Sequence, residues 1–368
     1  MPFVMKIDIS QFRRDSSFYG ELNLLLTVKS FDLQAIRKRY LASKKNNRAG
    51  SVERRKVALG GLVSVFLKNG QSSEERVLST LKEPRGIDFH KGQLAISSEN
   101  KAYVLTDTIH TIQNDWFSYI HTVEFSPFNE ENLLISSSGY DCVFEYNWKQ
   151  NSCEWEWFAW ENGMYQGKDS QTNTPLYLTR NKEQFKLWDK EGKNAVLVDD
   201  PLTQVFPTAK RAAFINSVSY HQSKEGVLLA TLFHKGSVAQ IEQKSGAISM
   251  VMDGLKNPHG GWQSANVLMA TSTASGEVRL NNDAFLFQNL ANKPAELAEM
   301  EWLQNSKRIN DFILTIDSNR TSFVVFHPKK QLYDMIPYND NWAVQDMIEG
   351  KVSEKQVELL QSLSLSNE

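Results

Sequence analysis

Four short phrases of the sequence each place one polar side chain at the start of a strand-like run. They are Pro84-Arg85-Gly86-Ile87, Ile120-His121-Thr122-Val123, Ile215-Asn216-Ser217-Val218 and Pro258-His259-Gly260-Gly261. Imidazole, guanidinium and amide groups that converge on a bound substrate can act as base, nucleophile and orienting groups. We therefore expect His121 and His259 to be catalytic, and Arg85 and Asn216 to bind a substrate.

A second set of polar residues occupies the turn that follows the second strand of each repeated unit. It comprises Asn100, Asp141, His234 and Ser275. We expect these turns and the four strand starts to emerge on one face, where Asp141 joins the substrate-binding set. His121, His234 and His259 form a predicted metal set, which suits zinc or another transition metal better than calcium. For each of these residues taken alone, the alternative to a role in the site is a structural one, namely a hydrogen bond that holds neighbouring units together.

The elements that must position these residues recur along the chain. The four strand starts are separated by 36, 95 and 43 residues, and each precedes short apolar runs that end in small or hydroxyl residues, such as Gln93–Ser98 and Asn132–Ser138. Runs of this length and type are typical of buried strands, and four antiparallel strands make one propeller blade. The pattern predicts an all-β, six-bladed β-propeller, with five or seven blades as alternatives.

Several segments fall outside the regular repeat. The propeller is expected to span residues 1–340, with a basic loop at 34–58 and an insertion at 164–210 lying on its faces. Residues 3–9 suit a terminal strand that closes the ring. The tail, 341–368, is expected to be helical because apolar residues between Val344 and Leu363 follow a helical spacing.

The phrases around Pro84-Arg85-Gly86-Ile87 and Pro258-His259-Gly260 resemble the repeats of NHL-type and gluconolactonase-like six-bladed propellers. The His-Thr-Val and Asn-Ser-Val phrases also resemble arylsulfotransferase-like propellers, and the resemblance covers about residues 80–285. Gluconolactonase-like enzymes hold calcium with a Glu, Asn and Asp set, of which only Asn216 has a counterpart here. Arylsulfotransferase-like enzymes use a histidine nucleophile, which the resemblance places at His121 or His259.

Composition narrows the classes of partner. The chain has 368 residues, a formal net charge of −2 and two cysteines, so neither a nucleic acid nor a membrane partner is expected, and Cys142 and Cys153 are expected to be reduced and packed. The amino terminus lacks the pattern of a secretory signal, which favours a cytoplasmic location. The segment from Arg37 to Lys56 contains nine basic residues and one acidic residue, Glu53. This composition indicates either a solvated loop or a segment that binds an anionic ligand or RNA.

These observations predict a small-molecule site at the mouth of a propeller channel, with or without a divalent metal. If the protein is an enzyme, we expect a histidine-dependent hydrolase, lyase or transferase, over whose site the basic loop and the insertion fold as lids. The alternative is a non-catalytic propeller that presents this face to a protein partner. Nucleotide loops, serine-hydrolase elbows and zinc-protease motifs do not occur in the sequence.

Overall fold

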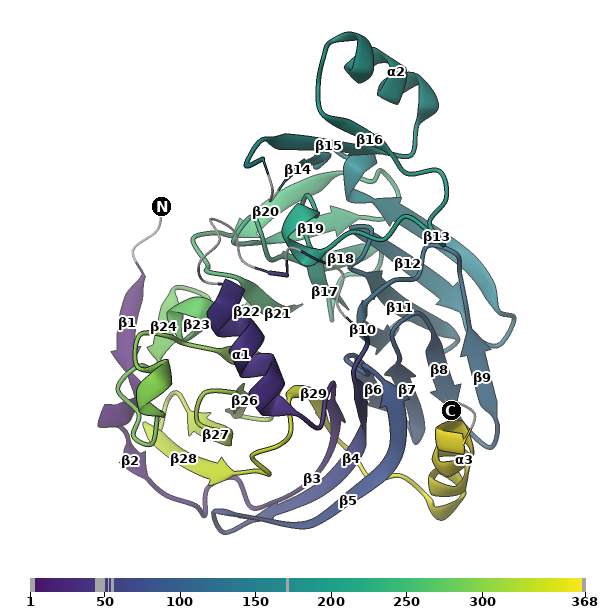
Figure 1. The fold of residues 1–368 in the computed structure, drawn as a ribbon. Helices are drawn as coiled ribbons and strands as arrows, with labels where there is room; N and C mark the ends of the chain where they lie inside the picture. Colours follow the sequence, from purple (N-terminus) through teal and green to yellow (C-terminus); the bar gives the residue numbers. More distant parts are fainter. Residues whose placement is uncertain (1–3, 44–49, 52, 54–55, 170–171, 366–368) are drawn as a thin grey trace.

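Short β-strands make up most of this protein, whose computed structural model is shown in Figure 1. The structure describes residues 1–368 except 1–3, 44–49, 52, 54–55, 170–171 and 366–368. The described strands form seven sheets, six of which have four or five strands and one of which has three. Inner runs such as Leu133, Leu134 and Ile135 are buried on both faces, because each sheet packs between two neighbours.

Four of the sheets follow the repeat that the sequence predicts. The first contains β6 (Ile87–His90), β7 (Gln93–Ser97), β8 (Ala102–Leu105) and β9 (Ile109–Ile112), and the second contains β10 (Ile120–Phe125), β11 (Asn132–Ser137), β12 (Cys142–Asn147) and β13 (Ser152–Phe158). The third contains β17 (Ile215–Tyr220), β18 (Val227–Leu232), β19 (Ser237–Glu242) and β20 (Ile248–Met252). The fourth contains β21 (Pro258–Ser264), β22 (Val267–Ser272), β23 (Glu277–Leu280) and β24 (Asp283–Leu286).

Two further sheets join the ends of the chain to this series. One contains β25 (Leu303–Ile309), β26 (Phe312–Asp317), β27 (Ser322–His327) and β28 (Leu332–Pro337), with β2 (Arg13–Arg14) at its outer edge. The other pairs β29 (Val344–Glu349) with β3 (Glu21–Val28), β4 (Leu59–Lys68) and β5 (Gln71–Lys82). The inner strands contact one another in the cyclic order β29, β6, β10, β17, β21, β25 and back to β29. The fold is therefore all-β and propeller-like.

The carboxyl-terminal segment corrects part of the prediction for the tail. Residues 344–349 form strand β29, not a helix, and the pairing of Val344 with Val28 joins the two ends of the chain. The helical spacing misled because a bulge between Val344 and Asp346 brings both Val344 and Met347 to the buried side. The rest of the tail is helical as expected, in α3 (Glu354–Leu365).

The amino-terminal strand also differs from the expectation. Strand β1 (Met5–Asp8) pairs in parallel with β24 at the outer edge of a sheet, so it adds a fifth strand there, and β29 provides the joining strand instead. Phe3, the first residue of the predicted closing strand, lies outside the described residues.

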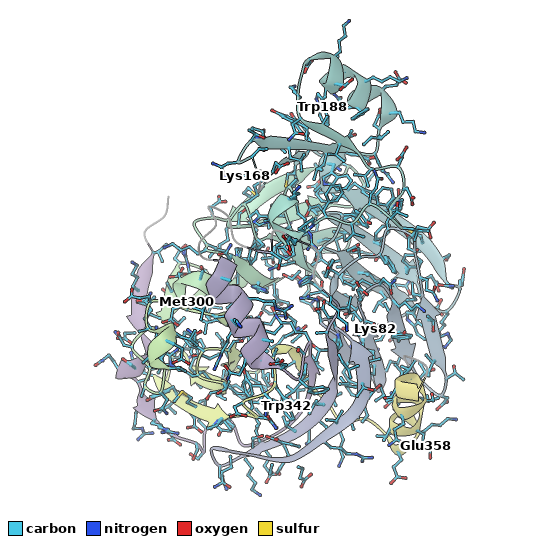
Figure 2. The ribbon with its side chains drawn as sticks, in the orientation of Figure 1. Lys82, Lys168, Trp188, Met300, Trp342 and Glu358 are labelled. Atoms are coloured by element: carbon cyan, nitrogen blue, oxygen red, sulfur yellow. The ribbon has the colours of Figure 1, made fainter. Side chains whose placement is uncertain are left out.

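The insertion at 164–210 forms a small unit of its own. It contains β14 (Gln166–Lys168), β15 (Pro175–Thr179), β16 (Ala195–Leu197) and α2 (Lys182–Lys190), and Figure 1 shows it projecting from the edge of the ring. Trp188, labelled in Figure 2, packs on Tyr165 and Tyr177 with ring centroids 5.0 and 5.5 Å away. The insertion thus forms a three-stranded sheet of its own, and its strands are not part of the cyclic series of inner strands.

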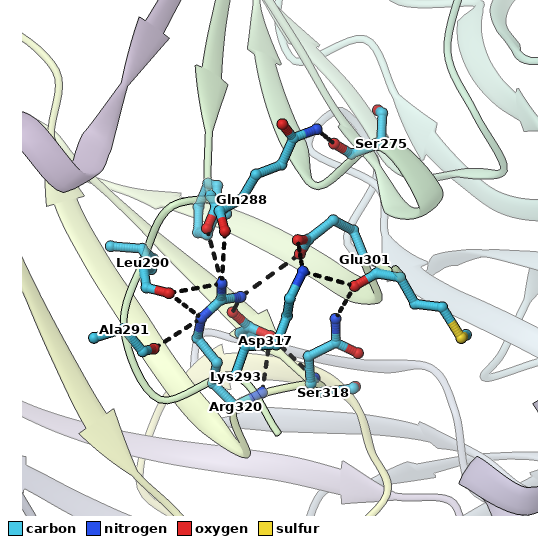
Figure 3. A network of polar contacts seen from close by, with 12 residues as sticks. Ser275, Gln288, Leu290, Ala291, Lys293, Glu301, Asp317, Ser318 and Arg320 are labelled. Atoms are coloured by element: carbon cyan, nitrogen blue, oxygen red, sulfur yellow. Dashed lines mark hydrogen bonds and ion pairs between the residues drawn. The ribbon is translucent and has the colours of Figure 1, made fainter. Parts of the chain in front are cut away.

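Helix α1 (Leu33–Ser43) begins the basic segment and crosses one face of the ring (Figure 1). Its Arg37 side chain donates from Nη2 to the carbonyls of Ser318 and Asn319, at 2.8 and 2.9 Å. Figure 3 shows what holds that turn: Arg320 bonds Asp317 at 2.8 Å and reaches five further polar groups. Five of the nine basic residues, Lys44, Lys45, Arg48, Arg54 and Arg55, lie outside the described residues.

Two remaining expectations concern cysteine and membranes. Cys142 is buried and Cys153 exposed, and neither forms a disulfide, so the prediction of packed thiols is wrong for Cys153. Within the described part of the chain, no helix is both long and apolar enough to cross a bilayer.

Candidate functional site

The residues that start the inner strands line one cavity of about 160 Å³, here called the mouth cavity. Its wall includes Arg85, His121, His259, Gln304 and Gln345, which occupy equivalent positions on five of the six inner strands. Sequence reasoning missed Gln304 and Gln345, because their blades lack the Pro-x-Gly or His-Thr-Val phrases; the equivalent spacing before β25 and β29 was the available signal.

Part of the basic segment lies over this cavity. Ile36 and Arg39 of α1 line it, as do Gly50 and Ser51, and Thr208 contributes from the insertion. Residues of both segments thus line this cavity. Whether they move as lids stays a prediction.

Arg85 connects a carboxylate to an imidazole at the start of β6. Its Nη2 donates to Glu83 Oε2 at 3.1 Å, and its Nη1 donates to His121 Nε2 at 3.0 Å. The other ring nitrogen of His121, Nδ1, lies 2.9 Å from the carbonyl of Tyr119; since a carbonyl can only accept, Nδ1 carries the proton. Burial, and then the charge of Arg85, hold the pKa of His121 well below its usual value. His121 is thus neutral, with both nitrogens engaged.

His259 is also held through Nδ1, but its Nε2 differs from that of His121. Its Nδ1 lies 2.7 Å from Thr273 Oγ1 and 3.3 Å from the carbonyl of Asn257, so Nδ1 carries the proton and Nε2 the lone pair. Among the described residues, Nε2 has no hydrogen-bond partner, and His259 lines the cavity. Burial, followed by the charge of Lys29, lowers the pKa of His259 to about 3.

The backbone before these side chains takes an unusual conformation. Glu83, Tyr119, Phe214 and Asn257 each lie two residues before a strand-start residue and each have a positive φ, between 42° and 52°. Such conformations cost about 1–3 kcal/mol in residues other than glycine and gather at functional sites. Here they turn the carbonyls of Tyr119 and Asn257 toward Nδ1 of the two histidines.

The electrostatic character of the mouth cavity is positive. Lys29, Arg39, Arg85 and Arg211 line it, whereas none of the described lining residues carries a carboxylate. The guanidinium of Arg211 lies 4.7 Å from the ring centre of Tyr119 and 4.9 Å from that of Phe214. The positive charge of this lining favours an anion over a cation as the bound species.

Three predicted site residues lie outside the mouth cavity. Asp141 is fully buried and accepts from the backbone N–H groups of Ala212, Ala213 and Ile215 at 2.9, 2.9 and 3.2 Å, which fixes the chain entering β17. Asn216 is 2% exposed and donates to the carbonyl of Pro258 at 2.8 Å. His234 lies 2.8 Å from the carbonyl of Thr208 through Nε2.

The predicted metal set is not gathered around one point. In the residues that the structure describes, no group of three or more His, Cys, Asp or Glu side chains is arranged to hold a metal ion. Of His121, His234 and His259, only the first and third share the mouth cavity.

Comparison with known proteins supports the fold. No family model matches the chain, and no curated protein matches its sequence. A crystal structure of a nidogen/laminin complex superimposes with a TM-score of 0.50 at 8% identity, covering 89% of this chain and 97% of that one. A protein of unknown function from Bacteroides caccae gives 0.48 at 10% identity, covering 89% and 98%.

A virginiamycin B lyase from Staphylococcus aureus gives a TM-score of 0.40 at 10% identity, covering 74% of this chain and 71% of that one. The nidogen/laminin match is β-propeller-like, which agrees with the cyclic order of the inner strands. At these identities the likeness concerns the fold and carries no activity.

Proposed function

We propose that the protein binds an anionic small molecule in the mouth cavity and that His259 acts on it as a base or nucleophile. The observation that carries this proposal is the lining: four cations and two neutral imidazoles, without a carboxylate. The chemistry that fits is polar, namely hydrolysis, elimination or group transfer. A cavity of about 160 Å³ has room for a small oxyanion or carboxylate.

The two histidines have different parts in this proposal. His121 accepts from Arg85 and so orients a guanidinium, whereas His259 offers an open Nε2 lone pair. A bound anion would raise the pKa of His259 by attraction, which makes the imidazole a stronger base when the ligand is present. Gln304 and Gln345, whose side chains bond each other at 3.1 Å, add amide groups to the wall.

Finer assignments of fold and setting belong to the same proposal. Six sheets around the cyclic inner strands support a six-bladed propeller of the NHL-like or gluconolactonase-like kind. A divalent metal and a cytoplasmic location remain predictions; elemental analysis of the purified protein would test the first.

Anion binding is tested by thermal unfolding with sulfate, phosphate and citrate against chloride at equal ionic strength. Because sulfate and phosphate stabilise proteins generally, the decisive comparison is between Arg39→Ala and Lys38→Ala, which remove neighbouring exposed cations of α1, only the first of which lines the cavity. We expect at least tenfold weaker binding for Arg39→Ala, as for one charged hydrogen bond of roughly 1.5–3 kcal/mol. Equal effects of the two variants would refute the site.

The open nitrogen of His259 is tested by diethyl pyrocarbonate, which modifies neutral, accessible imidazoles. We expect His259 to react at neutral pH and to be protected by a bound anion, whereas His121, with both nitrogens engaged, reacts slowly. Peptide mass spectrometry identifies the modified residue, and His259→Gln gives the blank. Preferential modification of His121 would contradict the assignment of His259 as the reactive group.

A further inference from the structure

The same inner strands carry a second cavity, of about 460 Å³, three residues beyond the mouth positions. We call it the floor cavity; it is lined on these strands by Asp88, Glu124, Ser219, Trp262, Lys307 and Ile348. Three residues of extended strand span roughly 10 Å. The floor cavity is therefore a separate space, farther along the strands than the mouth cavity.

Its charge is opposite to that of the mouth. The carboxylates of Asp88, Glu124 and Asp346 all line it, and the ammonium of Lys307 lies 3.6 Å from Asp346 Oδ1. Asp88 accepts one backbone N–H on each oxygen, from Phe89 and Phe125. One ammonium thus faces three carboxylates in this part of the cavity.

The side chain of Glu124 is hydrogen-bonded through one of its two oxygens. Its Oε1 accepts from the backbone N–H of Tyr220 and from Gln222 Nε2, at 3.3 and 2.9 Å. Its Oε2 accepts no hydrogen bond from a described residue, and Glu124 lines the cavity. This oxygen is available to a donor from outside the chain.

An amide oxygen provides an independent sign of a missing ligand. Asn305 is 5% exposed and lines the floor cavity, and its amide hydrogen-bonds Asp346. Its Oδ1 has no partner among the described residues. An unpaired buried acceptor costs about 1–3 kcal/mol, and glycine at 260 leaves it room, since a Cβ there would lie 2.4 Å from Oδ1.

We propose that the floor cavity binds an organic ammonium ion, a protonated alkyl amine whose N–H groups donate to Asn305 Oδ1 and to the carboxylates. Trp262 and Met269 line the same cavity and suit its methylene groups, and the indole face attracts a cation. A metal ion fits less well, because the acidic side chains of the described residues form no metal-holding group. Acceptors that need N–H donors favour an amine over a quaternary ammonium ion.

Binding of this kind is coupled to a proton. Burial, and then the charge of Asp88, raise the pKa of Glu124 to about 8. The charged or titratable groups that face Glu124 are Asp88 and His90 of β6, Tyr220 of β17, Lys307 of β25 and Asp346 of β29, with Arg308 and Glu349 on the cavity wall. An added ammonium ion favours the ionised carboxylate, so binding near pH 7 should release a proton and tighten as the pH rises toward 8.

The test is titration calorimetry of the full chain with 1,4-diaminobutane and 1,5-diaminopentane, in two buffers of different ionisation heat. We expect binding with proton release at pH 7, and at least tenfold weaker binding of tetramethylammonium, which has charge but no N–H donor. Absence of diamine binding at both pH 7 and 8.5 would overturn the proposal. Equal affinity for tetramethylammonium would overturn recognition through N–H groups.

Variants separate this site from general charge attraction. Glu124→Gln should weaken diamine binding at least tenfold and abolish proton release, whereas Glu358→Gln, the same change on the exposed face of α3 (Figure 2), should leave both unchanged. Lys307→Met, which removes the competing ammonium, should tighten diamine binding severalfold. If Glu124→Gln does not fold, Lys307→Met decides: unchanged or weaker binding contradicts the proposal. Sulfate binding at the mouth should be the same in all three variants.

Discussion

The Arg85 side chain both stabilises the fold and lines the mouth cavity. This side chain is 5% exposed, its ion-pair partner Glu83 is fully buried, and its Nη1 donates to the imidazole of His121. Taking one member from a buried ion pair leaves the other charge without compensation, which costs about 3–5 kcal/mol. The guanidinium that would meet an anionic ligand is thus also part of the support of the ring.

Arg85→Met is expected to lower the free energy of unfolding by about 3 kcal/mol or more, because it removes the guanidinium that pairs with the buried carboxylate of Glu83. The double variant Glu83→Gln with Arg85→Met should regain much of that loss. Denaturant unfolding measures both, and Arg308→Met, in the exposed part of β25, is the control. A double variant no more stable than Arg85→Met would mean that the pair is not the source of the loss. In the double variant the pKa of His121 should also rise, since Arg85 lowers it.

The residue scale also shows what sequence could and could not predict. Arg85, His121 and His259 were predictable, because equal phrases occupy equal strand positions and so reach the same cavity. Asp141, Asn216 and His234 were not, because each side chain turns to a backbone group of another segment. That choice depends on where the neighbouring chain passes, which a local phrase does not encode. Asp88 and Glu124 lie three residues after Arg85 and His121, so they also occupy equivalent strand positions, but they were not among the predicted site residues.

At the scale of elements, α1 depends on a turn far away in sequence. Leu33 and Ile36 pack with Trp302 and Ala343 in a small apolar cluster, and Arg37 donates twice to the turn that Arg320 holds. The described contacts of the helix with the ring thus include this cluster, the Arg37 side chain and the backbone N–H of Leu33, which donates to the carbonyl of Asn341 at 3.0 Å. Its position decides whether Ile36 and Arg39 cover the mouth cavity.

Arg37→Ala should loosen α1 without unfolding the ring. Loss of hydrogen bonds from a charged donor, worth roughly 1.5–3 kcal/mol each, should speed amide hydrogen exchange in α1 about tenfold or more. Lys38→Ala is the matched control, and exchange in β26 and β27 reports on the ring. Unchanged exchange in α1 would show that the hydrogen bonds of Arg37 do not hold the helix. Anion binding should weaken in parallel, because Arg39 shifts with the helix.

Strand β29 shows that the spacing of apolar residues alone does not distinguish a helix from a strand. Val344 and Met347 are three residues apart, which predicts a helix face, yet the bulge after Val344 makes the same spacing fit a strand. Val344 and Met347 are both fully buried, in a cluster formed by residues of β3, β4 and the β25–β28 sheet. Only the pairing partner Val28, more than 300 residues earlier, decides between the two structures.

At the scale of the whole molecule, one repeat lines two cavities of opposite charge. Five of the six inner strands contribute a strand-start residue to the mouth cavity, and all six contribute a residue to the floor cavity three positions later. The formal net charge of −2 conceals this separation. Each cavity contributes its own pH dependence to the free energy of unfolding, because burial raises the pKa of Glu124 and lowers the pKa of His259.

The two shifts predict opposite slopes of stability against pH. The folded-state pKa of Glu124 is about 8 against an ordinary 4.5, so its contribution is full below 4.5 and is lost as the pH rises to about 8. The folded-state pKa of His259 is about 3 against an ordinary 6.5, so its contribution is full above 6.5 and is lost as the pH falls to about 3. The two slopes oppose each other between 4.5 and 6.5.

Denaturant unfolding at a series of pH values tests both contributions. Glu124→Gln should flatten the decline between pH 6.5 and 8, and His259→Gln the decline between pH 4.5 and 3. One titrating group changes the free energy of unfolding by at most about 1.4 kcal/mol per pH unit, and the half-buried Glu124 by less. Slopes are compared, not absolute stabilities, because each substitution also changes hydrogen bonds. A Glu124→Gln protein with the parent's slope above pH 6.5 would show that this carboxyl group is ionised in the folded chain, and an amine would then bind at the floor without releasing a proton.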